Sequence, residues 1–441
     1  MPMQEKIFDL PDPVKLLQQL IRFNTTNPPG NEAECICYIN NLLTAAGFEP
    51  CILEKKEGRP NLIARWRGTG AAPPFLMYGH ADVVTVEHQE WTYPPFEGAI
   101  ADGCVWGRGT LDMKGALAMM IMAMMRAKAS QKQFPGDIIL AVVSDEEDEG
   151  EFGARFLVEE HREIFKNISY AIGEFGAFSM PMGRKTFYPI MVAEKQKCSL
   201  RTSIKGPGGH GSMPMRNGAM AGLARLLDKL NRGRLPVHIT PPSRMMLESM
   251  AAHMPLSQQP VVKGLLNPFW TDRIIGLLGA KGRFFDPLLH NTVNATIVRG
   301  GDKINVIPSE ITVDLDGRLL SGFTPEEMLR ELNALVGLEY QFQVTSFIPG
   351  PVAVNMGLFD TLAKILREAD PAAIPIPFVI GAVTDARYFA RLGIQTYGFT
   401  PMILPPDIDF SRLIHSADER IPIAALEFGA RAMEKLLGSL K

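Results

Sequence analysis

Residues 138–149 read IILAVVSDEEDE: an apolar run, then Ser144, then consecutive acidic residues. A short apolar run bounded by polar residues is typical of a strand buried inside a sheet. An acidic run is usually a solvated face. At the end of a buried strand, however, like charges this close resist joint ionisation unless a cation lies beside them. The stretch therefore favours a buried strand whose carboxyl end holds a divalent metal ion.

Outward from this stretch, apolar strand runs alternate with segments of helical spacing. Similar runs occur at 62–66 and 75–78, and a helical stretch over 114–128 lies between 75–78 and 138–143. Strands that alternate with helices predict an α/β domain with helices on a mostly parallel sheet. Further helices are expected over 14–22, 33–46, 154–161 and 425–437. The helix over 114–128 carries methionines that we expect to pack in the core: Met119, Met120, Met122, Met124 and Met125.

The middle of the chain has a different pattern. Two strand–helix–strand units predict a compact α+β domain, ferredoxin-like, inserted into the α/β chain. Their expected strands are 197–205, 294–298, 310–314 and 340–347, and their expected helices are 219–230 and 325–336. Residues 236–291 lie between the two halves and have no clear period, which indicates an excursion with short helices. We therefore expect a catalytic domain in two segments, 1–194 and 349–441, around an inserted domain at 195–348.

Composition narrows the class of protein. The chain has 441 residues with 45 Lys and Arg against 48 Asp and Glu, which argues against a protein built to bind nucleic acid or anionic membranes. The 5 cysteines form no CxxC pair, so a reducing compartment is expected. The polar N-terminal stretch 1–13 lacks a signal-peptide core, and no apolar run reaches about 18 residues. We expect a soluble, cytoplasmic protein.

Two sequence neighbourhoods contain candidate metal ligands. His80 directly follows an apolar strand, where open α/β sheets present reactive groups, and Asp82 could fix the tautomer of its ring. Taken alone, such a pair is more often a loop histidine with an incidental acid. Asp112 follows two glycines and opens a helix. It is either a helix N-cap or a carboxylate that bridges two cations.

Glu174 and His415 complete the set. Each would be unremarkable alone, as a loop acid and a surface histidine. Together with His80, Asp112 and the acidic run, they place two histidines and several carboxylates at separate strand ends. Two metal ions need about this complement, namely one nitrogen and one terminal carboxylate each, plus a shared bridging carboxylate. The lack of thiolate ligands favours a hydrolytic site over a structural zinc site.

The residues around these candidates resemble a known family. The matching blocks, in order, are GHADVV (79–84), WTYPPFEG (91–98), DGCVWGRGTLDMKG (102–115), SDEE (144–147), AIGEFG (171–176), GGHGSMP (208–214), GGDKINVIPSE (300–310) and IHSADERIP (414–422). They resemble the di-zinc exopeptidases and N-acyl-amino-acid amidohydrolases. That family includes aminoacylases, acetylornithine deacetylase, succinyl-diaminopimelate desuccinylase, glutamate carboxypeptidases and carboxypeptidase-S-like enzymes. The resemblance runs nearly end to end.

The resemblance implies a role for each candidate residue. It implies two Zn²⁺ per subunit, which Co²⁺ or Mn²⁺ could replace. Asp112 would bridge the ions, His80 and Glu174 would complete one site, and Glu147 and His415 the other. Glu146 would act as general base and then acid, while Asp82 would orient His80. In this family the peptide bond after the bridging aspartate is often cis. The acidic run leaves a second register open, in which Glu147 and Asp148 take the places of Glu146 and Glu147.

The inserted domain would supply further groups. In the family it forms a dimer contact and serves as a lid, so the resemblance implies a homodimer. Its histidine, here His210, would reach the partner subunit's site and stabilise the oxyanion. The residues expected to bind the substrate are Arg318, Asn305 and Asn217. Residues 381–385 would form part of the pocket floor.

The implied activity is zinc-dependent hydrolysis of an amide bond in a small N-acyl amino acid or peptide. Two zinc ions would activate the water and Glu146 would move its proton, as in an aminoacylase or carboxypeptidase. A glutamate at position 174 tends to accompany these activities, whereas an aspartate accompanies aminopeptidases and dipeptidases. A dipeptidase or aminopeptidase, a biosynthetic deacylase and a non-catalytic binding protein stay open as alternatives. No nucleic-acid or membrane partner is expected.

Overall fold

The computed structural model describes residues 12–351 and 353–440, so nearly all of the polar N-terminal stretch lies outside it. The chain forms two compact units, each described here by itself. Unit 1 holds the chain up to Val192, then Asn355–Phe378 and the part from Thr384 onwards. Unit 2 is Ala193–Val354 together with Val379–Val383. The short return segment 379–383, which the sequence prediction placed in the catalytic domain, therefore packs with unit 2.

The central sheet of unit 1 has a parallel middle that is flanked by antiparallel pairs. Its main path is β1-β2-β6-β3-β7-β17-β9-β16, and β8 pairs with β9. Strands β6, β3, β7 and β17 run parallel, whereas β1 pairs antiparallel with β2, β2 with β6, and β9 with β17 and β8. The bounds are β1 Cys51–Glu54, β2 Pro60–Trp66, β3 Phe75–His80, β6 Ile138–Val143, β7 Tyr170–Gly173, β8 Met180–Met182, β9 Lys185–Glu194, β16 Ala373–Ile380 and β17 Gln395–Gly398.

The register of this sheet explains where the polar residues lie. His80 pairs with Val143, so β3 and β6 end side by side. Every residue of both strands is buried, which is why both read as continuous apolar runs. Polar residues that follow the two strands therefore emerge next to each other at one edge of the sheet.

Helices of unit 1 pack on the sheet and on each other. Helix α3 contacts α1, α14 and β3, and it is buried along almost its whole length. Its five methionines are at most 1% exposed, which confirms their packing in the core. The bounds are α1 Pro13–Arg22, α2 Ala33–Ala45, α3 Lys114–Ala129, α4 Ala154–Glu160, α11 Phe359–Ala369, α12 Ala386–Ala390, α13 Phe410–Leu413 and α14 Ile423–Leu437.

A small second sheet of unit 1 joins two distant parts of the chain. It has the order β18-β5-β4, with β4 Ala99–Ala101, β5 Cys104–Trp106 and β18 Arg420–Pro422. Strands β5 and β18 are antiparallel, and Arg420 pairs with Trp106. The loop after β5 therefore starts at the same end of this sheet at which the loop before β18 arrives.

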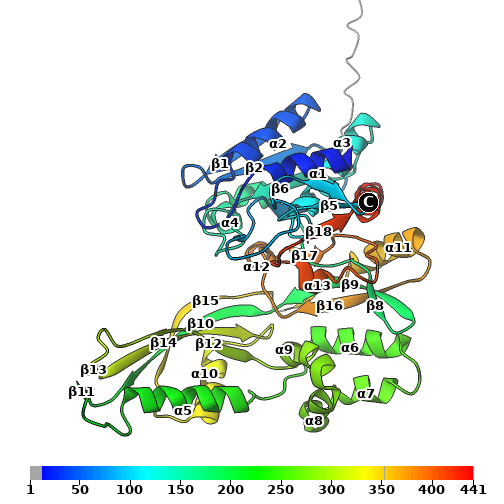
Figure 1. Cartoon of the computed structure of the whole chain (residues 1–441). Coiled ribbons are helices and arrows are strands. Elements are labelled where there is room, and N and C mark those ends of the chain that lie inside the picture. Colours follow the sequence, from blue (N-terminus) through cyan, green and yellow to red (C-terminus); the bar gives the residue numbers. More distant parts are fainter. Residues whose placement is uncertain (1–11, 352, 441) are drawn as a thin grey trace, which may run out of the picture. The chain divides into compact units, whose positions relative to one another are not determined.

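Unit 2 is built on a four-stranded antiparallel sheet of order β12-β14-β10-β15. This is the strand order of a ferredoxin-like fold. Helices α5 and α10 cover one face, where Leu200, Leu226 and Leu332 are part of a shared core (Figure 1). The bounds are β10 Gln196–Lys205, β12 Thr292–Arg299, β14 Glu310–Leu319, β15 Phe342–Ile348, α5 Ala219–Arg232 and α10 Pro325–Val336. A separate pair joins β11 (Gly209–His210) to β13 (Val306–Ile307).

The excursion between α5 and β12 is helical. It contains α6 Pro241–His253, α7 Gln259–Gly264, α8 Pro268–Leu278 and α9 Asp286–Leu289. Helix α6 begins at a cap in which the Thr240 side chain accepts from the Ser243 amide. Met246 and Met250 are fully buried in α6, so these thioethers pack inside the excursion. Among the described residues, no helix is both long and apolar enough to cross a membrane.

The burial of α3 gives a test of the core. Ile121 is fully buried in this helix, whereas Ile100 on β4 is 53% exposed. Ile121→Ala should lower the free energy of unfolding of unit 1 by about 2–5 kcal/mol, because the deletion leaves a cavity. The matched change Ile100→Ala should cost about 0.5 kcal/mol or less. Urea unfolding followed by circular dichroism compares the two, and equal losses would contradict the packing described.

Candidate metal centre

Three parallel strands of unit 1 deliver polar side chains to one edge of the sheet. His80 is the last residue of β3, Glu146 and Glu147 follow β6, and Glu174 follows β7. Open α/β sheets place their functional groups at this carboxyl edge. Asp112 lies just before α3, and His415 lies in the loop before β18. The structure thus brings six candidates of the sequence analysis together in one cluster at this edge, namely His80, Asp112, Glu146, Glu147, Glu174 and His415.

Asp112 occupies the middle of the cluster. Its Oδ1 lies 3.1 Å from His80 Nε2, and its Oδ2 lies 3.2 Å from His415 Nε2. Each carboxylate oxygen therefore faces a different imidazole, which is the arrangement of a carboxylate that bridges two ions. The peptide bond between Asp112 and Met113 is cis.

A second carboxylate accompanies each histidine. Glu174 Oε2 lies 3.4 Å from His80 Nε2, and Glu147 Oε2 lies 3.3 Å from His415 Nε2. The contact of Glu147 with His415 agrees with the register in which Glu146 and Glu147 take the two roles. Glu147 Oε1 is buried and has no hydrogen-bond partner among the described residues. This orphaned oxygen, together with the nitrogen and oxygen donors around it, fits a site for divalent cations.

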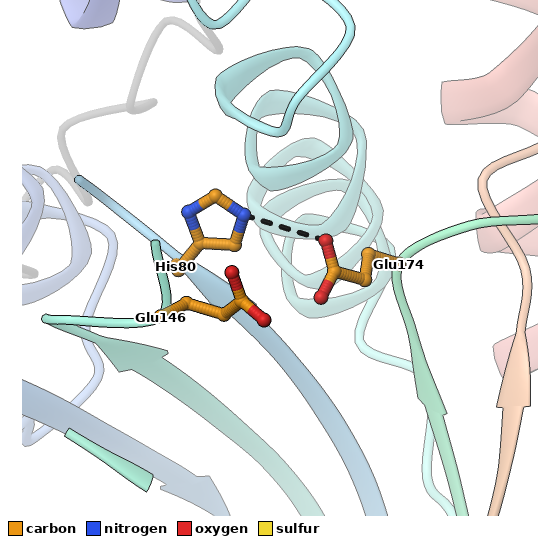
Figure 2. A group of neighbouring side chains, drawn as sticks. All are labelled: His80, Glu146 and Glu174. Carbon is orange, nitrogen blue, oxygen red and sulfur yellow. Dashed lines mark ion pairs between the residues drawn. The ribbon is translucent and has the colours of Figure 1, made fainter. Parts of the chain in front are cut away.

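Glu146 lies beside the first of these sites. Figure 2 shows its carboxylate close to the side chains of His80 and Glu174. These residues each offer a ligand atom, and the atoms lie within 4.8 Å of one another. Glu146 can therefore reach a water molecule or a substrate atom held at that site, which is the placement a general base needs.

The electrostatics of the cluster favour cations. Burial, with the nearby Asp112 charge, raises the pKa of Glu147 to about 8. Burial, followed by the charge of Glu146, raises the pKa of Glu174 well above its usual value. Hydrogen bonds that the His415 ring donates to Asp112 and Glu147 raise the pKa of His415 to about 10. The protein alone must therefore hold protons among these carboxylates, and divalent ions would replace them.

Glu146 has its own balance. Burial raises the pKa of Glu146, although the charges of His80 and Arg387 oppose this shift. Arg387, on α12, is itself buried. A carboxyl group with a raised pKa exchanges its proton more readily near neutral pH, which suits a group that must both accept and release one.

Asp82 holds two parts of the site at once. The Nδ1 atom of His80 lies 2.9 Å from the Asp82 main-chain oxygen and 3.5 Å from its carboxylate. This leaves Nε2 of the ring directed at Asp112 and Glu174. The Asp82 carboxylate accepts from the amides of Glu146 and Glu147, at 3.2 and 3.1 Å. Asp82 therefore orients the loop after β6 as well as the ring of His80.

A buried network behind Asp82 was not found by sequence reasoning. Asn27 Nδ2 donates to Asp82 and to Asp145, at 2.9 and 3.1 Å. Arg59 donates to Asp145 and, through two nitrogens, to Glu32. Burial raises the pKa of Glu32 to about 6, against the effect of Arg59. The sequence spacing of these residues does not indicate the network, because only folding brings them together.

The remaining predicted residues lie in unit 2, whereas the cluster lies in unit 1. His210, on β11, is exposed, and its Nδ1 lies 2.7 Å from Ser212 Oγ. Arg318, on β14, donates to both oxygens of Asp316, at 2.8 and 3.0 Å. The main-chain oxygen of Asn305 accepts from Gly211, and Asn217 has a positive φ of 58°. The roles of these four residues stay predictions.

The fold and the cluster of histidines and carboxylates fit a metal-dependent hydrolase. The model of peptidase family M20/M25/M40 matches residues 76–439 of this chain. The chain belongs to this family. This confirms the resemblance drawn from the sequence blocks.

Curated relatives with different activities are similar to this chain. Probable carboxypeptidase S-like 2 of Dictyostelium discoideum is 28% identical, over 82% of this chain and 71% of that protein. Human N-fatty-acyl-amino acid synthase/hydrolase PM20D1 is 26% identical, over 82% and 73%. Succinyl-diaminopimelate desuccinylase of Paracoccus denitrificans is 27% identical, over 97% and 98%.

Solved structures share the fold. The M20 family metallo-carboxypeptidase Sso-CP2 from Sulfolobus solfataricus has a TM-score of 0.70 at 18% identity, covering 97% of this chain and 98% of that one. The Bacillus subtilis YXEP protein, titled a dinuclear metal binding peptidase, has a TM-score of 0.58 at 14% identity, covering 97% of both chains.

The position of Asp112 gives a prediction about metal content. Asp112→Asn should reduce binding at both sites, because one oxygen of this carboxylate faces each histidine. His415→Ala should weaken only one site, because His415 contacts Asp112 and Glu147 but not the pair of His80 and Glu174. Elemental analysis after dialysis, with wild-type chain as control, gives the number of ions per chain. Retention of both ions by Asp112→Asn would refute the bridging assignment.

Proposed function

We propose that this protein hydrolyses the amide bond of N-acyl amino acids or peptides, as a cytoplasmic homodimer that holds two Zn²⁺ per subunit. The observation that carries the proposal is Asp112, which directs one oxygen to each of two histidine–carboxylate pairs beside Glu146. A binding protein without catalysis would have no need of the additional carboxylate of Glu146 beside the two pairs.

The ligand set divides into two sites that share Asp112. His80 and Glu174 would hold one ion, and His415 and Glu147 the other. When bound, such a pair of ions polarises the substrate carbonyl and lowers the pKa of water towards about 7. The chain's own groups then handle the protons and hold the geometry.

Glu146 is the proposed proton carrier. Its carboxylate accepts a proton from the attacking water and later delivers that proton to the amine nitrogen as the C–N bond breaks. Two residues act on Glu146. The charge of Arg387 limits the rise in the pKa of Glu146, and the carboxylate of Asp82 accepts from the Glu146 amide and so holds the residue in place. The products are a carboxylic acid and a free amine.

Unit 2 would supply groups that recognise the substrate. The exposed imidazole of His210 would donate to the developing oxyanion in the partner subunit's site. Arg318 would bind the carboxylate of the amino-acid portion, and Asn305 and Asn217 are further polar candidates for substrate binding on the same unit. Because Arg318 already pairs with Asp316, an incoming carboxylate would share that guanidinium or displace Asp316.

The substrate class follows from Glu174 and from the relatives. A glutamate at this position and the similarity to a carboxypeptidase S-like protein and an N-fatty-acyl-amino acid hydrolase support an acyl amino acid or a peptide cleaved at its C-terminus. A second candidate is a biosynthetic deacylase, which the end-to-end similarity to a succinyl-diaminopimelate desuccinylase favours. A panel of N-acyl amino acids, dipeptides and N-succinyl-diaminopimelate, each with added zinc, separates the two.

Glu146 provides the main test of the mechanism. Glu146→Gln should lower kcat by about 10²–10⁴ or more, because the proton carrier is lost. Both ions should stay bound, since Glu146 is not needed as a ligand. Turnover of the best panel substrate and metal content are measured on the same preparation. Full activity in this variant would refute the assignment, and a lost ion would make Glu146 a ligand instead.

Hybrid dimers test the role of His210. His210→Ala and Glu146→Gln should each be inactive alone. A mixture of the two variants, refolded or exchanged together, should regain about a quarter to about a half of wild-type activity. The gain is expected because one composite site in a mixed dimer would keep both residues intact. The control is each variant carried through the same exchange by itself. If mixing restores nothing although mixed dimers form, His210 does not act across subunits.

A further inference from the structure

Glu419 is a buried carboxylate that the proposed mechanism does not use. It is 1% exposed and lies just before β18, a few residues after His415. Both of its oxygens point at the loop that carries Asp112. Oε1 accepts from the amides of Leu111 and Asp112, at 2.7 and 3.2 Å, and Oε2 accepts from the amide of Gly109 at 3.1 Å. Its main-chain oxygen accepts from Gly107.

Arg108 ties the same loop to the other side of the site. Its NH1 nitrogen donates to Glu419 at 2.7 Å and to the Ser416 main-chain oxygen at 3.1 Å. Its NH2 nitrogen donates to the Gln89 side chain, which in turn donates to the main-chain oxygen of His415 at 2.9 Å. These bonds link the chain next to Asp112 with the chain next to His415.

The loop of His415 needs such outside support. His415 and Asp418 both have φ near +60°, a conformation that residues other than glycine seldom adopt. Such conformations persist where the surroundings fix them. Asp418 is fixed by the amide and hydroxyl of Thr92, at 2.7 and 2.8 Å. Gln89 and Arg108 hold the remainder of the loop.

Stability alone does not account for this arrangement. A buried ion pair such as Arg108 and Glu419 often contributes little net free energy of folding, because both charges lose their hydration. What the pair does achieve is geometry, since its bonds end on the loops that present Asp112 and His415. A change in the spacing of these two ligands would alter the fit of the ion between them.

We infer that Glu419, with Arg108 and Gln89, is a positioning group that sets the distance between Asp112 and His415 and thereby the affinity of the Glu147–His415 site. The inference rests on the proposed two-metal function. Glu419 touches neither substrate nor ion and acts through the two loops that it joins.

The test is metal binding by the full chain with Glu419→Gln. The carboxamide keeps the size of the side chain, but its NH₂ group cannot accept from the amides and guanidinium that now surround the carboxylate. One of the two zinc ions should bind about 10–100-fold more weakly, which is the usual effect of losing an outer partner of a metal ligand. The ion held by His80 and Glu174 should be less affected. Zinc titration against a competing chelator measures both affinities.

Asp137→Asn is the matched control. Asp137 likewise accepts from a guanidinium and an amide, those of Arg67 and Gly68, but it is less buried than Glu419 and lies before β6, away from the cluster. Both variants should melt at lower temperature without metal. Only Glu419→Gln should change a zinc affinity, which separates positioning from general stability.

Gln89→Leu keeps the inference open to refutation if Glu419→Gln does not fold. Gln89 is only partly buried, and its loss removes the bonds to Arg108 and His415 alone. It should weaken one ion about tenfold. Two ions bound by wild-type chain and by the variants with equal affinity would overturn the inference and leave the function intact. Fewer than two ions on the wild-type chain would overturn the proposed function, and the inference with it.

Discussion

The structure of unit 1 depends on the crowding of carboxylates at the edge of its sheet. Asp112, Glu147 and Glu174 crowd around the buried imidazole of His80 and the half-exposed imidazole of His415, so each negative charge disfavours the next. Such a cluster costs free energy unless protons or cations balance it. The surrounding chain accepts this cost because a divalent ion, once bound, is held by ligands that already face it. Part of the polar structure of unit 1 keeps these side chains in place.

Two hydrogen-bonded networks do this from opposite sides. In the first network, Asp82 accepts hydrogen bonds from amides of the loop after β6 and orients the ring of His80. Asn27 connects Asp82 to Asp145. On the other side, Glu419 and Arg108 connect the loops of Asp112 and His415. Each network is buried, where hydrogen bonds to charged groups are strong and unpaired charges are costly. Residues outside the cluster of histidines and carboxylates therefore hold the loops that carry it.

Much of the fold could be predicted from the sequence because its signals are local. The apolar run 138–143 is strand β6, and the methionine-rich segment is the buried helix α3. The alternation of strands and helices indicated the parallel centre of the sheet. The predicted domain bounds stay a prediction, and residues 379–383 group with unit 2 although the neighbouring parts of the chain belong to unit 1. The helices of the excursion had no clear period in the sequence, although Met246 and Met250 of α6 are fully buried.

For the site, the sequence by itself determined which residue types stand at strand ends and, through the resemblance of its blocks, the family and the expected ligands. It left open whether Glu147 or Asp148 faces His415. It also contained no mark of Asn27, Arg59, Arg108 or Glu419 as partners of the ligands. Only the tertiary structure decided these points. A hydrogen bond requires two groups to lie close together in space, and these partners are up to hundreds of positions apart in the sequence. Sequence spacing records which groups the chain carries, while folding fixes which of them meet.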